Sequence, residues 1–469
     1  MPIFLLVFLL FSGFSQGSAL DLPSSQISDD SLLRIRLKDS WLKESPGRVL
    51  AMRPVIETLA SGEKVEVRAM EGRDNFMVIL SREMMSGRAA VDGLPGVPRV
   101  GTGSFQGYAQ GSWMLIRRKD TGEAQFIRIF LRSGEQTYIQ FRPYNDEKLS
   151  GEKCLMDAVF YGGFVTRSLP IPVSFERLYT MPLNDVLKLA GDKFPRKYFD
   201  PDPVYYRDTR KFIAQVRAQI GNLNYEDDGA IDENGNYVFI DNLQRQTAAP
   251  GLNCSGFAKW LIDGLLRPIT GERLKIAPLK APFGERGSSF TALWEERRDP
   301  YFGLDWIRNL AAEANRVLRS PSYSTLDEFE VRVDNFSYVL ANENRTVVTH
   351  TYPGFLPEAG YDIEGLYPLL YTLAIDDPFS FYLAAINTER GAPITAANLR
   401  GAPRLRQYYH VAAFVPYFNE FGAFRIAVFE SAAETSAAET SLNGFRSRHR
   451  GQREYVNLVR IPVRTAFDP

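Results

Sequence analysis

Hydrophobic residues in the first third of the chain occur in short runs, several of which alternate with polar residues. The runs are rich in β-branched and aromatic residues, and turn signals such as Asp120-Thr121-Gly122 and Ser133-Gly134 lie between them. Such runs predict β-strands at 32–37, 65–70, 76–81, 113–118, 124–131, 137–142 and 154–162. Many short strands at this spacing predict an all-β domain over residues 20–170, built as an antiparallel sandwich or a partly open barrel.

After about residue 170 the pattern changes, and helical periodicity alternates with strand-like runs. Helices are predicted at 183–191, 208–221 and 302–319. Strands are predicted at 328–336, 345–352, 409–415, 423–430 and 454–463, and the segments 365–373 and 376–387 are rich in aromatic residues. Residues 171–469 are therefore predicted to form a second domain of the α+β class.

A further predicted helix begins near Cys254, in the segment GLNCSGFAKWLIDG. From Phe257 onward the apolar residues recur at helical spacing, while Lys259, Asp263 and Arg267 take the opposite face. Pro268 is expected to end the helix. Cys254 lies three and four residues before two apolar positions, so its thiol is expected over the buried face.

The position of Cys254 has chemical meaning. The N-terminus of a helix presents unpaired N–H groups and the positive end of the helix dipole, which stabilise a thiolate. The same N–H groups can donate to an oxyanion during acyl transfer. A cysteine nucleophile also needs a histidine base that the fold brings near it, and the chain offers three: His350, His410 and His449.

His410 is the best candidate for the base because it begins a predicted hairpin that ends at Glu430. If the turn centres near Glu420, antiparallel pairing places His410 directly opposite Glu430 on one side of the sheet. A carboxylate in that place holds the imidazole in one tautomer, as the third member of a catalytic triad does. Asn419 in the turn is the alternative third residue. The competing interpretation is a strand-end histidine with a structural hydrogen bond.

The other two histidines are weaker candidates. His350 ends a predicted strand without an obvious orienting partner, and His449 lies in the basic segment SRHRG. The competing interpretation of Cys254 is a disulfide with Cys154, since these are the two cysteines of the chain. Cys154 lies in a predicted buried strand, where a cysteine behaves as a small hydrophobic residue.

Composition and charge narrow the classes of function. The chain has 469 residues, of which 45% are hydrophobic and 24% charged, as in ordinary globular proteins. The net charge of −1 gives no reason to expect nucleic acid or an anionic membrane surface as a partner. Neither the charge nor the composition indicates an oligomeric state.

The N-terminus predicts export. An apolar run at residues 3–11 is followed by small residues up to Ala19, which is typical of a signal peptide over residues 1–19, although no Lys or Arg precedes the run. The alternative is a buried N-terminal strand. No comparable apolar run recurs, so no transmembrane segment is expected after cleavage. The protein is therefore expected in the periplasm or outside the cell.

The acidic segment at residues 225–241 has some features of a calcium-binding loop. Its DENGN motif resembles part of an EF-hand, but Ala230 would occupy the first ligand position and no Glu stands at the closing position. Asn234-Gly235 between apolar runs instead predicts a tight hairpin turn. We expect neither a metal nor a cofactor.

The two motifs NCSGFAKWLID and HVAAFVPYF resemble the NlpC-type family of papain-like cysteine peptidases, which trim peptidoglycan stem peptides in bacterial envelopes. The likeness rests on Cys254, Ser255, Gly256, His410 and Val411, with Glu430 as the polar third residue, and covers residues 220–270 and 405–432. It implies a Cys-bearing helix packed on an antiparallel sheet. It also implies a large insertion at about residues 270–404, because Cys254 and His410 lie far apart in the sequence.

One departure from the family motif concerns specificity. Asn253 stands where the family has an aspartate that is implicated in binding the free amino terminus of the substrate. By resemblance, Asn253, Ser255 and Gly256 are the expected substrate-binding and oxyanion residues. Losing the charge at Asn253 leaves the usual stem-peptide specificity open.

The resulting hypothesis is an exported cysteine peptidase or amidase in which Cys254, His410 and Glu430 hydrolyse stem-peptide or related amide bonds. The alternative is a cell-envelope binding protein that keeps the fold without catalysis, using its N-terminal β-domain to bind wall glycan or a partner. A transferase that uses the same residues with an amine in place of water is a third possibility.

Overall fold

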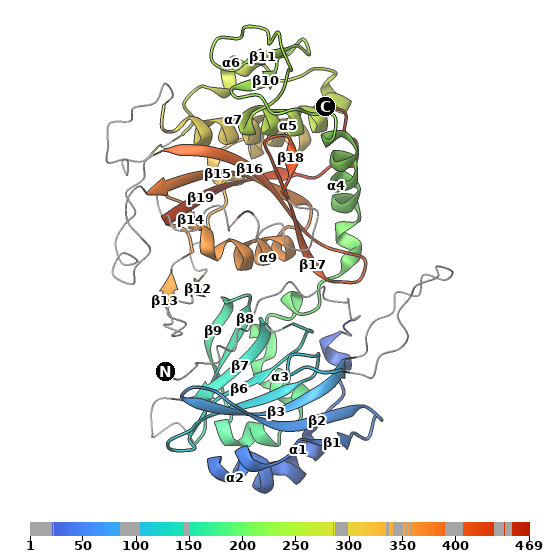
Figure 1. The fold of residues 1–469 in the computed structure, drawn as a ribbon, viewed down its shortest axis with the longest axis vertical. Coiled ribbons are helices and arrows are strands. Elements are labelled where there is room, and N and C mark those ends of the chain that lie inside the picture. The colour runs from blue at the N-terminus through green and yellow to red at the C-terminus, as the bar shows by residue number, and fades with distance from the viewer. Residues whose placement is uncertain are drawn as a thin grey trace, which may run out of the picture.

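The fold is described from a computed structural model that covers much of the chain from Asp21 to Pro469 (Figure 1). Besides residues 1–20, the residues outside this description are 22, 85–103, 135, 145–150, 285, 287–298, 334–336, 341–349, 353, 357–358, 390–406, 436–444 and 446–452. The predicted signal peptide and His449 therefore lie outside the described residues, as do the loop 393–406 and most of the repeat SAAETSAAETS.

The N-terminal strands form one antiparallel sheet of 11 described strands. Strands β1 to β9 follow one another as a meander, apart from β4, which lies outside the main order and pairs with β3. Strands β12 and β13 extend the sheet beyond β9. The strands are β1 (Val55–Thr58), β2 (Lys64–Glu71), β3 (Asn75–Met84), β4 (Ser104–Phe105), β5 (Trp113–Arg118), β6 (Ala124–Ile129), β7 (Thr137–Pro143), β8 (Cys154–Phe160), β9 (Gly163–Ile171), β12 (Ser337–Leu340) and β13 (His350–Tyr352). The predicted all-β composition of residues 20–170 is wrong, because helices α1 (Ser31–Leu37) and α2 (Pro46–Ala51) lie in this region and contribute to the core beside the sheet.

The segment 32–37, predicted as a strand, is helix α1 (Ser31–Leu37). A strand would place Leu33, Ile35 and Leu37 on one face, yet Ile35 is 52% exposed while Leu33 and Leu37 are buried at the i, i+4 spacing of a helix. The run was too short for its hydrophobic pattern to separate the two periods.

Buried Arg34 fastens α1 to the rest of the domain. Its guanidinium donates to the carboxylate of Asp30 at 2.8 Å and to the backbone carbonyls of Leu178, Tyr179 and Met181 at 2.9–3.0 Å. Helices α2 (Pro46–Ala51) and α3 (Leu183–Ala190) contribute to the same core. Residues beyond the predicted β-domain are thus part of its packing.

A second antiparallel sheet of six described strands forms the C-terminal half. Its order is β14-β19-β15-β16-β17-β18, with β14 (Tyr361–Asp362), β15 (Ser380–Glu389), β16 (Tyr408–Phe418), β17 (Phe424–Glu430), β18 (Ala433–Glu434) and β19 (Arg453–Pro462). The described helices of this half are α4 (Arg207–Ile220), α5 (Cys254–Thr270), α6 (Ile276–Leu279), α7 (Phe302–Leu318), α8 (Leu326–Phe329) and α9 (Leu366–Asp376). Figure 1 shows α5 and α7 on one side of this sheet and α9 on the other. The fold is therefore of the mixed α+β class.

Several predicted elements are confirmed, and a second predicted strand, besides the one at 32–37, is wrong. The helices α3, α4 and α7 and the strand β19 are confirmed, and so is the hairpin of β10 (Gly229–Ile231) and β11 (Tyr237–Phe239). The predicted strand at 328–336 is wrong, since α8 occupies its beginning and residues 331–333 form no strand.

Pro268 does not end α5, which continues to Thr270 and closes at Gly271 in the left-handed conformation. A proline inside a helix leaves the carbonyl four residues earlier without its usual donor. Here that carbonyl belongs to Gly264, and it accepts the backbone N–H of Asp468 at 2.8 Å. A contact from the end of the chain thus allows the helix to pass through Pro268.

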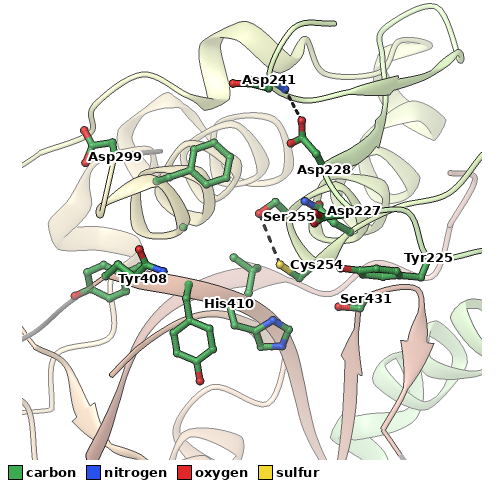
Figure 2. Close-up of a pocket in the computed structure, with 16 residues that line it drawn as sticks. Tyr225, Asp227, Asp228, Asp241, Cys254, Ser255, Asp299, Tyr408, His410 and Ser431 are labelled. Carbon is green, nitrogen blue, oxygen red and sulfur yellow. Dashed lines mark hydrogen bonds between the residues drawn. The ribbon is translucent and has the colours of Figure 1, made fainter. Parts of the chain in front are cut away.

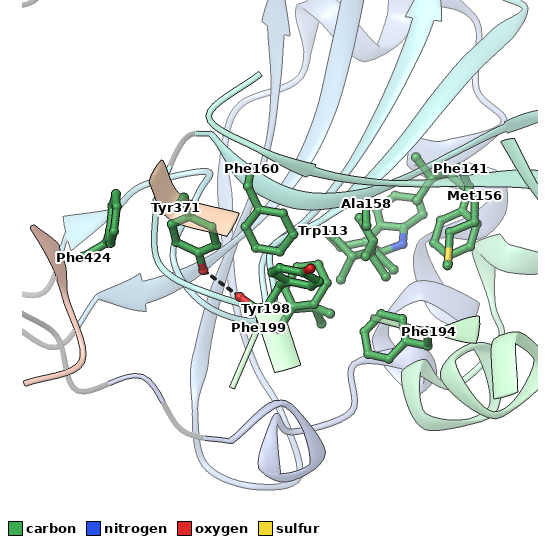
Figure 3. Close-up of a cluster of buried hydrophobic side chains, with 14 of the residues drawn as sticks. Trp113, Phe141, Met156, Ala158, Phe160, Phe194, Tyr198, Phe199, Tyr371 and Phe424 are labelled. Carbon is green, nitrogen blue, oxygen red and sulfur yellow. Dashed lines mark hydrogen bonds between the residues drawn. The ribbon is translucent and has the colours of Figure 1, made fainter. Parts of the chain in front are cut away.

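Helix α9 joins the two halves through an aromatic column (Figure 3). The Tyr371 ring stacks on Phe160 of β8 with centroids 4.8 Å apart and meets Phe424 of β17 edge-on at 5.0 Å. The Tyr371 hydroxyl donates to the carbonyl of Tyr198 at 2.6 Å. Residues on both sides of the predicted boundary at 170 therefore share one hydrophobic core.

Among the described residues, no helix is both long enough and apolar enough to cross a membrane.

Candidate functional site

Asn253 and Cys254 form the beginning of α5. The Asn253 side-chain oxygen accepts the N–H of Gly256 at 2.8 Å, which makes Asn253 the N-cap, and its own N–H donates to the carbonyl of Gly229 at 3.0 Å. Cys254 is the first helical residue and is partly exposed. The predicted position of the thiol in the first turn is confirmed.

Gly256 lets α5 approach β10 closely. A Cβ at this position would lie 2.0 Å from the carbonyl oxygen of Gly229, and a Cβ on Gly229 would lie 2.2 Å from the carbonyl oxygen of Gly251. These three glycines bring the loop before the helix, the hairpin and the helix into backbone contact. The contact holds the first turn, and with it Cys254, in one place.

His410 and Glu430 lie together on the neighbouring strands β16 and β17. The Nε2 atom of His410 is 2.7 Å from Oε2 of Glu430. The pairing differs from the prediction, because Ala413 pairs with Phe429 and Glu430 therefore falls beside Ala412. The turn is centred one residue later than predicted, which moves the register by two and keeps both side chains on the same face.

A β-bulge lies in β16 directly before His410. Ile386 of β15 pairs with His410, but the next residue, Asn387, pairs with Tyr408, so Tyr409 is the extra residue of β16. A bulge increases the local twist and redirects side chains, which is why bulges recur beside active sites. Glu430 contacts Nε2 of His410, and the thiol of Cys254 is hydrogen-bonded to the same imidazole. Figure 2 shows the thiol and the imidazole close together at the end of β16.

The surroundings of Cys254 stabilise its thiolate. Burial by itself raises the pKa of the thiol, but the hydrogen bond and charge of His410, the backbone N–H of Val411 and the hydroxyl of Ser255 outweigh burial. The net effect is a pKa lowered below the ordinary value for cysteine. His410 is thus the side chain that does most to favour the thiolate of Cys254 over the neutral thiol.

The sulfur faces a cavity of about 600 Å³ (Figure 2). Its described lining residues include four aspartates, and no lysine or arginine is among them. They are Tyr225, Asp227, Asp228, Asp241, Asn253, Cys254, Ser255, Asp299, Phe302, Gly303, Gln407, Tyr408, Tyr409, His410, Val411 and Ser431. The wall around the thiol is therefore acidic and aromatic.

The N–H groups of the first turn divide into two sets. Asn253 and Gly256 use their N–H groups within the protein, and the N–H of Gly256 donates to the helix cap. For the N–H groups of Cys254 and Ser255, no acceptor is found within the described part of the chain. Ser255 is held in place by Trp306, whose Nε1 donates to its carbonyl at 2.8 Å, and its Oγ lies 4.0 Å from the sulfur.

The polar face predicted for α5 is buried rather than solvated. Lys259 and Asp263 are each 1% exposed and form an ion pair with Nζ and Oδ2 2.6 Å apart. The other oxygen of Asp263 accepts the N–H of Leu274 at 2.8 Å. Helix α5 is thus enclosed on both faces, which fits a rigid platform for Cys254.

The competing interpretation of Cys254 as half of a disulfide is wrong, because both cysteines are free. Cys154 is buried in β8, where burial raises the pKa of its thiol to about 12. His350 begins β13, in the other sheet. Asn419 stays in the hairpin turn, where its side-chain oxygen accepts the N–H groups of Phe421 and Ala423.

Sequence reasoning missed Tyr225 and the aspartates. Figure 2 shows the Tyr225 ring reaching toward Cys254 from the loop before β10. Its pKa is raised by burial first and then by the negative charges of Asp227 and Cys254, so the phenol stays protonated. The run of acidic residues at 225–241 was the available signal in the sequence. Within the described residues, no cluster of three or more His, Cys, Asp or Glu side chains suited to a metal occurs.

Comparison with known proteins adds one finding. Residues 23–198 match a family model described as a domain of unknown function (DUF8515). The chain matches no curated protein and no solved structure. The matched region covers most of the N-terminal sheet and ends before Cys254, His410 and Glu430.

Proposed function

We propose that this protein is a cysteine peptidase or amidase whose nucleophile is Cys254, whose base is His410 and whose orienting acid is Glu430. The observation that supports it most is the hydrogen-bonded series from the Cys254 thiol to His410 and on to Glu430, at the wall of a cavity. We also propose that the C-terminal half is a papain-like arrangement, in which α5 presents the cysteine to the sheet that holds the other two residues.

The proposed reaction begins with the Cys254 thiolate and the His410 imidazolium. The sulfur adds to the amide carbonyl carbon, and the imidazolium gives its proton to the leaving nitrogen as the C–N bond breaks. Water then adds to the thioester while neutral His410 accepts a proton from it. Breaking the C–S bond releases the acid and restores the thiolate. Glu430 keeps Nε2 bound, so that Nδ1 stays directed at the sulfur.

The oxyanion of each tetrahedral intermediate needs donors in place. The backbone N–H of Cys254 suits this role because it lies at the positive end of α5 and beside the attacking sulfur. The protonated Tyr225 hydroxyl on the facing wall is a second donor. Ser255 would contribute to the oxyanion site through its backbone N–H. Its hydroxyl contacts the sulfur instead.

The acidic wall bears on the substrate. Asp227, Asp228, Asp241 and Asp299 repel anionic groups and favour neutral or positively charged ones near the thiol. Asn253 adds no charge, and its oxygen is occupied by the cap. Peptidoglycan stem peptides and related amides remain the proposed substrates, and a periplasmic or secreted location remains part of the proposal.

Hydrolysis of purified peptidoglycan and of its soluble fragments tests the proposal. Wild-type protein should release new amino groups, and Cys254→Ala and His410→Ala should reduce the rate at least about a thousandfold. Cys154→Ala is the matched control, since that thiol lies in the other half of the protein. Equal rates in wild type, Cys254→Ala and His410→Ala would contradict the proposal and favour the envelope-binding alternative.

A further inference from the structure

We propose that Thr435 is a positioning residue, whose hydroxyl holds the Glu430 carboxylate toward His410. This inference rests on the proposed function and extends its hydrogen-bonded series by one residue. The Thr435 hydroxyl contacts Oε1 of Glu430, and the other oxygen, Oε2, contacts His410. Thr435, Glu430, His410 and Cys254 therefore form one series, which runs from the residue after β18 through β17 and β16 to the beginning of α5.

The chain reverses immediately after Glu430 to bring Thr435 back. Ser431 and Ala432 both have positive φ angles, 47° and 61°, and Glu430 pairs with Ala433 across this two-residue turn. Positive φ at both central positions is the conformation that tight hairpins require, although Gly and Asn usually supply it. The N–H of Thr435 then donates to the carbonyl of Val428 at 2.9 Å, which places its side chain next to Glu430.

A second contact keeps the returning strand in place. Arg217 of α4 binds Glu434 through two parallel hydrogen bonds of 2.8 and 2.7 Å. Bidentate arginine–carboxylate pairs fix orientation as well as distance. Glu434 immediately precedes Thr435. The ion pair between Arg217 and Glu434 therefore ties the backbone next to Thr435 to α4.

The Thr435 hydroxyl matters because it donates a hydrogen bond to the buried, charged carboxylate of Glu430. Glu430 is 8% exposed, so water satisfies little of its carboxylate. An ionised carboxylate only accepts hydrogen bonds, and the hydroxyl of Thr435 must therefore donate. That donation favours the charged form of Glu430 and fixes its plane. Without it, protonation or rotation of Glu430 would weaken the imidazolium and, through it, the Cys254 thiolate.

The test compares Thr435→Val, which removes the hydroxyl at nearly constant volume, with Thr435→Ser, which keeps it. The readout is the rate of Cys254 alkylation by iodoacetamide as a function of pH, which needs no substrate. We expect Thr435→Val to slow alkylation at neutral pH about three- to tenfold and to move the profile to higher pH. Thr435→Ser should restore the wild-type profile.

Thr372→Val is the matched control. It makes the same substitution at a buried hydroxyl of α9 that donates to the carbonyl of Leu369 at 2.8 Å, away from the cavity. Thr435→Ala serves as the second variant if Thr435→Val does not fold. It also removes the hydroxyl, but it places no methyl group beside the carboxylate.

The outcomes separate this inference from the proposed function. If His410→Ala shifts the profile but Thr435→Val and Thr435→Ala leave it unchanged, Thr435 has no positioning role while the proposed function stands. If Thr435→Ser behaves like Thr435→Val, the hydroxyl is not what matters, and the inference fails. If wild-type Cys254 reacts no faster than it does in His410→Ala, the proposed function fails, and the role of Thr435 fails with it.

Discussion

The imidazole of His410 and the carboxylate of Glu430 meet diagonally across β16 and β17, with Nε2 and Oε2 2.7 Å apart. Glu430 is buried at 8% exposure, and the same imidazole is hydrogen-bonded to the thiol of Cys254. This arrangement makes the carboxylate the counter-charge of any imidazolium formed at His410.

Glu430→Gln should slow hydrolysis without abolishing it. The amide can still hydrogen-bond Nε2, but it no longer supplies the negative charge that stabilises the imidazolium. We expect kcat/KM to fall roughly ten- to hundredfold, with a smaller effect than Cys254→Ala. A kcat/KM equal to that of wild type would argue against the electrostatic role of Glu430.

Asn253→Asp keeps the side-chain cap of α5 and adds a negative charge, so it distinguishes the effect of the cap from the effect of charge. Aspartate caps a helix as well as asparagine, so the free energy of unfolding should stay within about 0.5 kcal/mol of wild type. The added negative charge beside the sulfur should raise the pKa of Cys254 and slow its alkylation near neutral pH. Asn253→Ala should instead cost about 1 kcal/mol of stability through loss of the cap. Urea unfolding and alkylation rates measure the two effects, and a stable Asn253→Ala would contradict the capping role.

Gly256→Ala should destabilise the protein and disturb the site. The new Cβ would lie 2.0 Å from the backbone oxygen of Gly229, so α5 or β10 must move. We expect a loss of about 2 kcal/mol or more in urea unfolding, together with slower alkylation of Cys254. Gly47→Ala in α2 is the control, since its Cβ would meet nothing within 4 Å, and it should be neutral or slightly stabilising.

Tyr371 should couple the stability of the two halves. Tyr371→Ala removes a ring that packs between Phe160 and Phe424, and we expect a loss of about 3–5 kcal/mol. Tyr371→Phe keeps the ring and should cost about 1 kcal/mol, for the hydrogen bond to Tyr198. Thermal unfolding followed by far-ultraviolet circular dichroism should show one transition in wild type. Two separate transitions would contradict a shared core.

Much of the local structure was predictable where the hydrophobic period was clear over many residues. Helices α4 and α7 and the hairpin with Asn234-Gly235 are long or chemically distinct enough to be identified from sequence. The helix α1 was missed because seven residues do not separate a period of 2 from one of 3.6. Helix α5 extends past Pro268 through a hydrogen bond from Asp468, which no local pattern indicates.

The site was partly predictable for a related reason. Alternation along β16 and β17 placed His410 and Glu430 on one face, and a register error of two residues left that result unchanged. The bulge at Tyr409, the return of Thr435 to Glu430 and the position of Tyr225 depend on tertiary contacts. The burial of Lys259 and Asp263 also could not be predicted, because ion pairs of this spacing are usually exposed.

Selective alkylation of the two cysteines tests the central claim most directly. Wild-type protein treated with iodoacetamide at about pH 7, below the ordinary thiol pKa of about 8.5, should be modified at Cys254 and not at Cys154, as peptide mass spectrometry would show. His410→Ala should slow the modification of Cys254 at the same pH, because loss of the imidazolium raises the pKa of the thiol. Rapid modification of Cys254 in wild type and slow modification in His410→Ala is the predicted result. Equal rates in the two proteins would contradict a thiolate supported by His410.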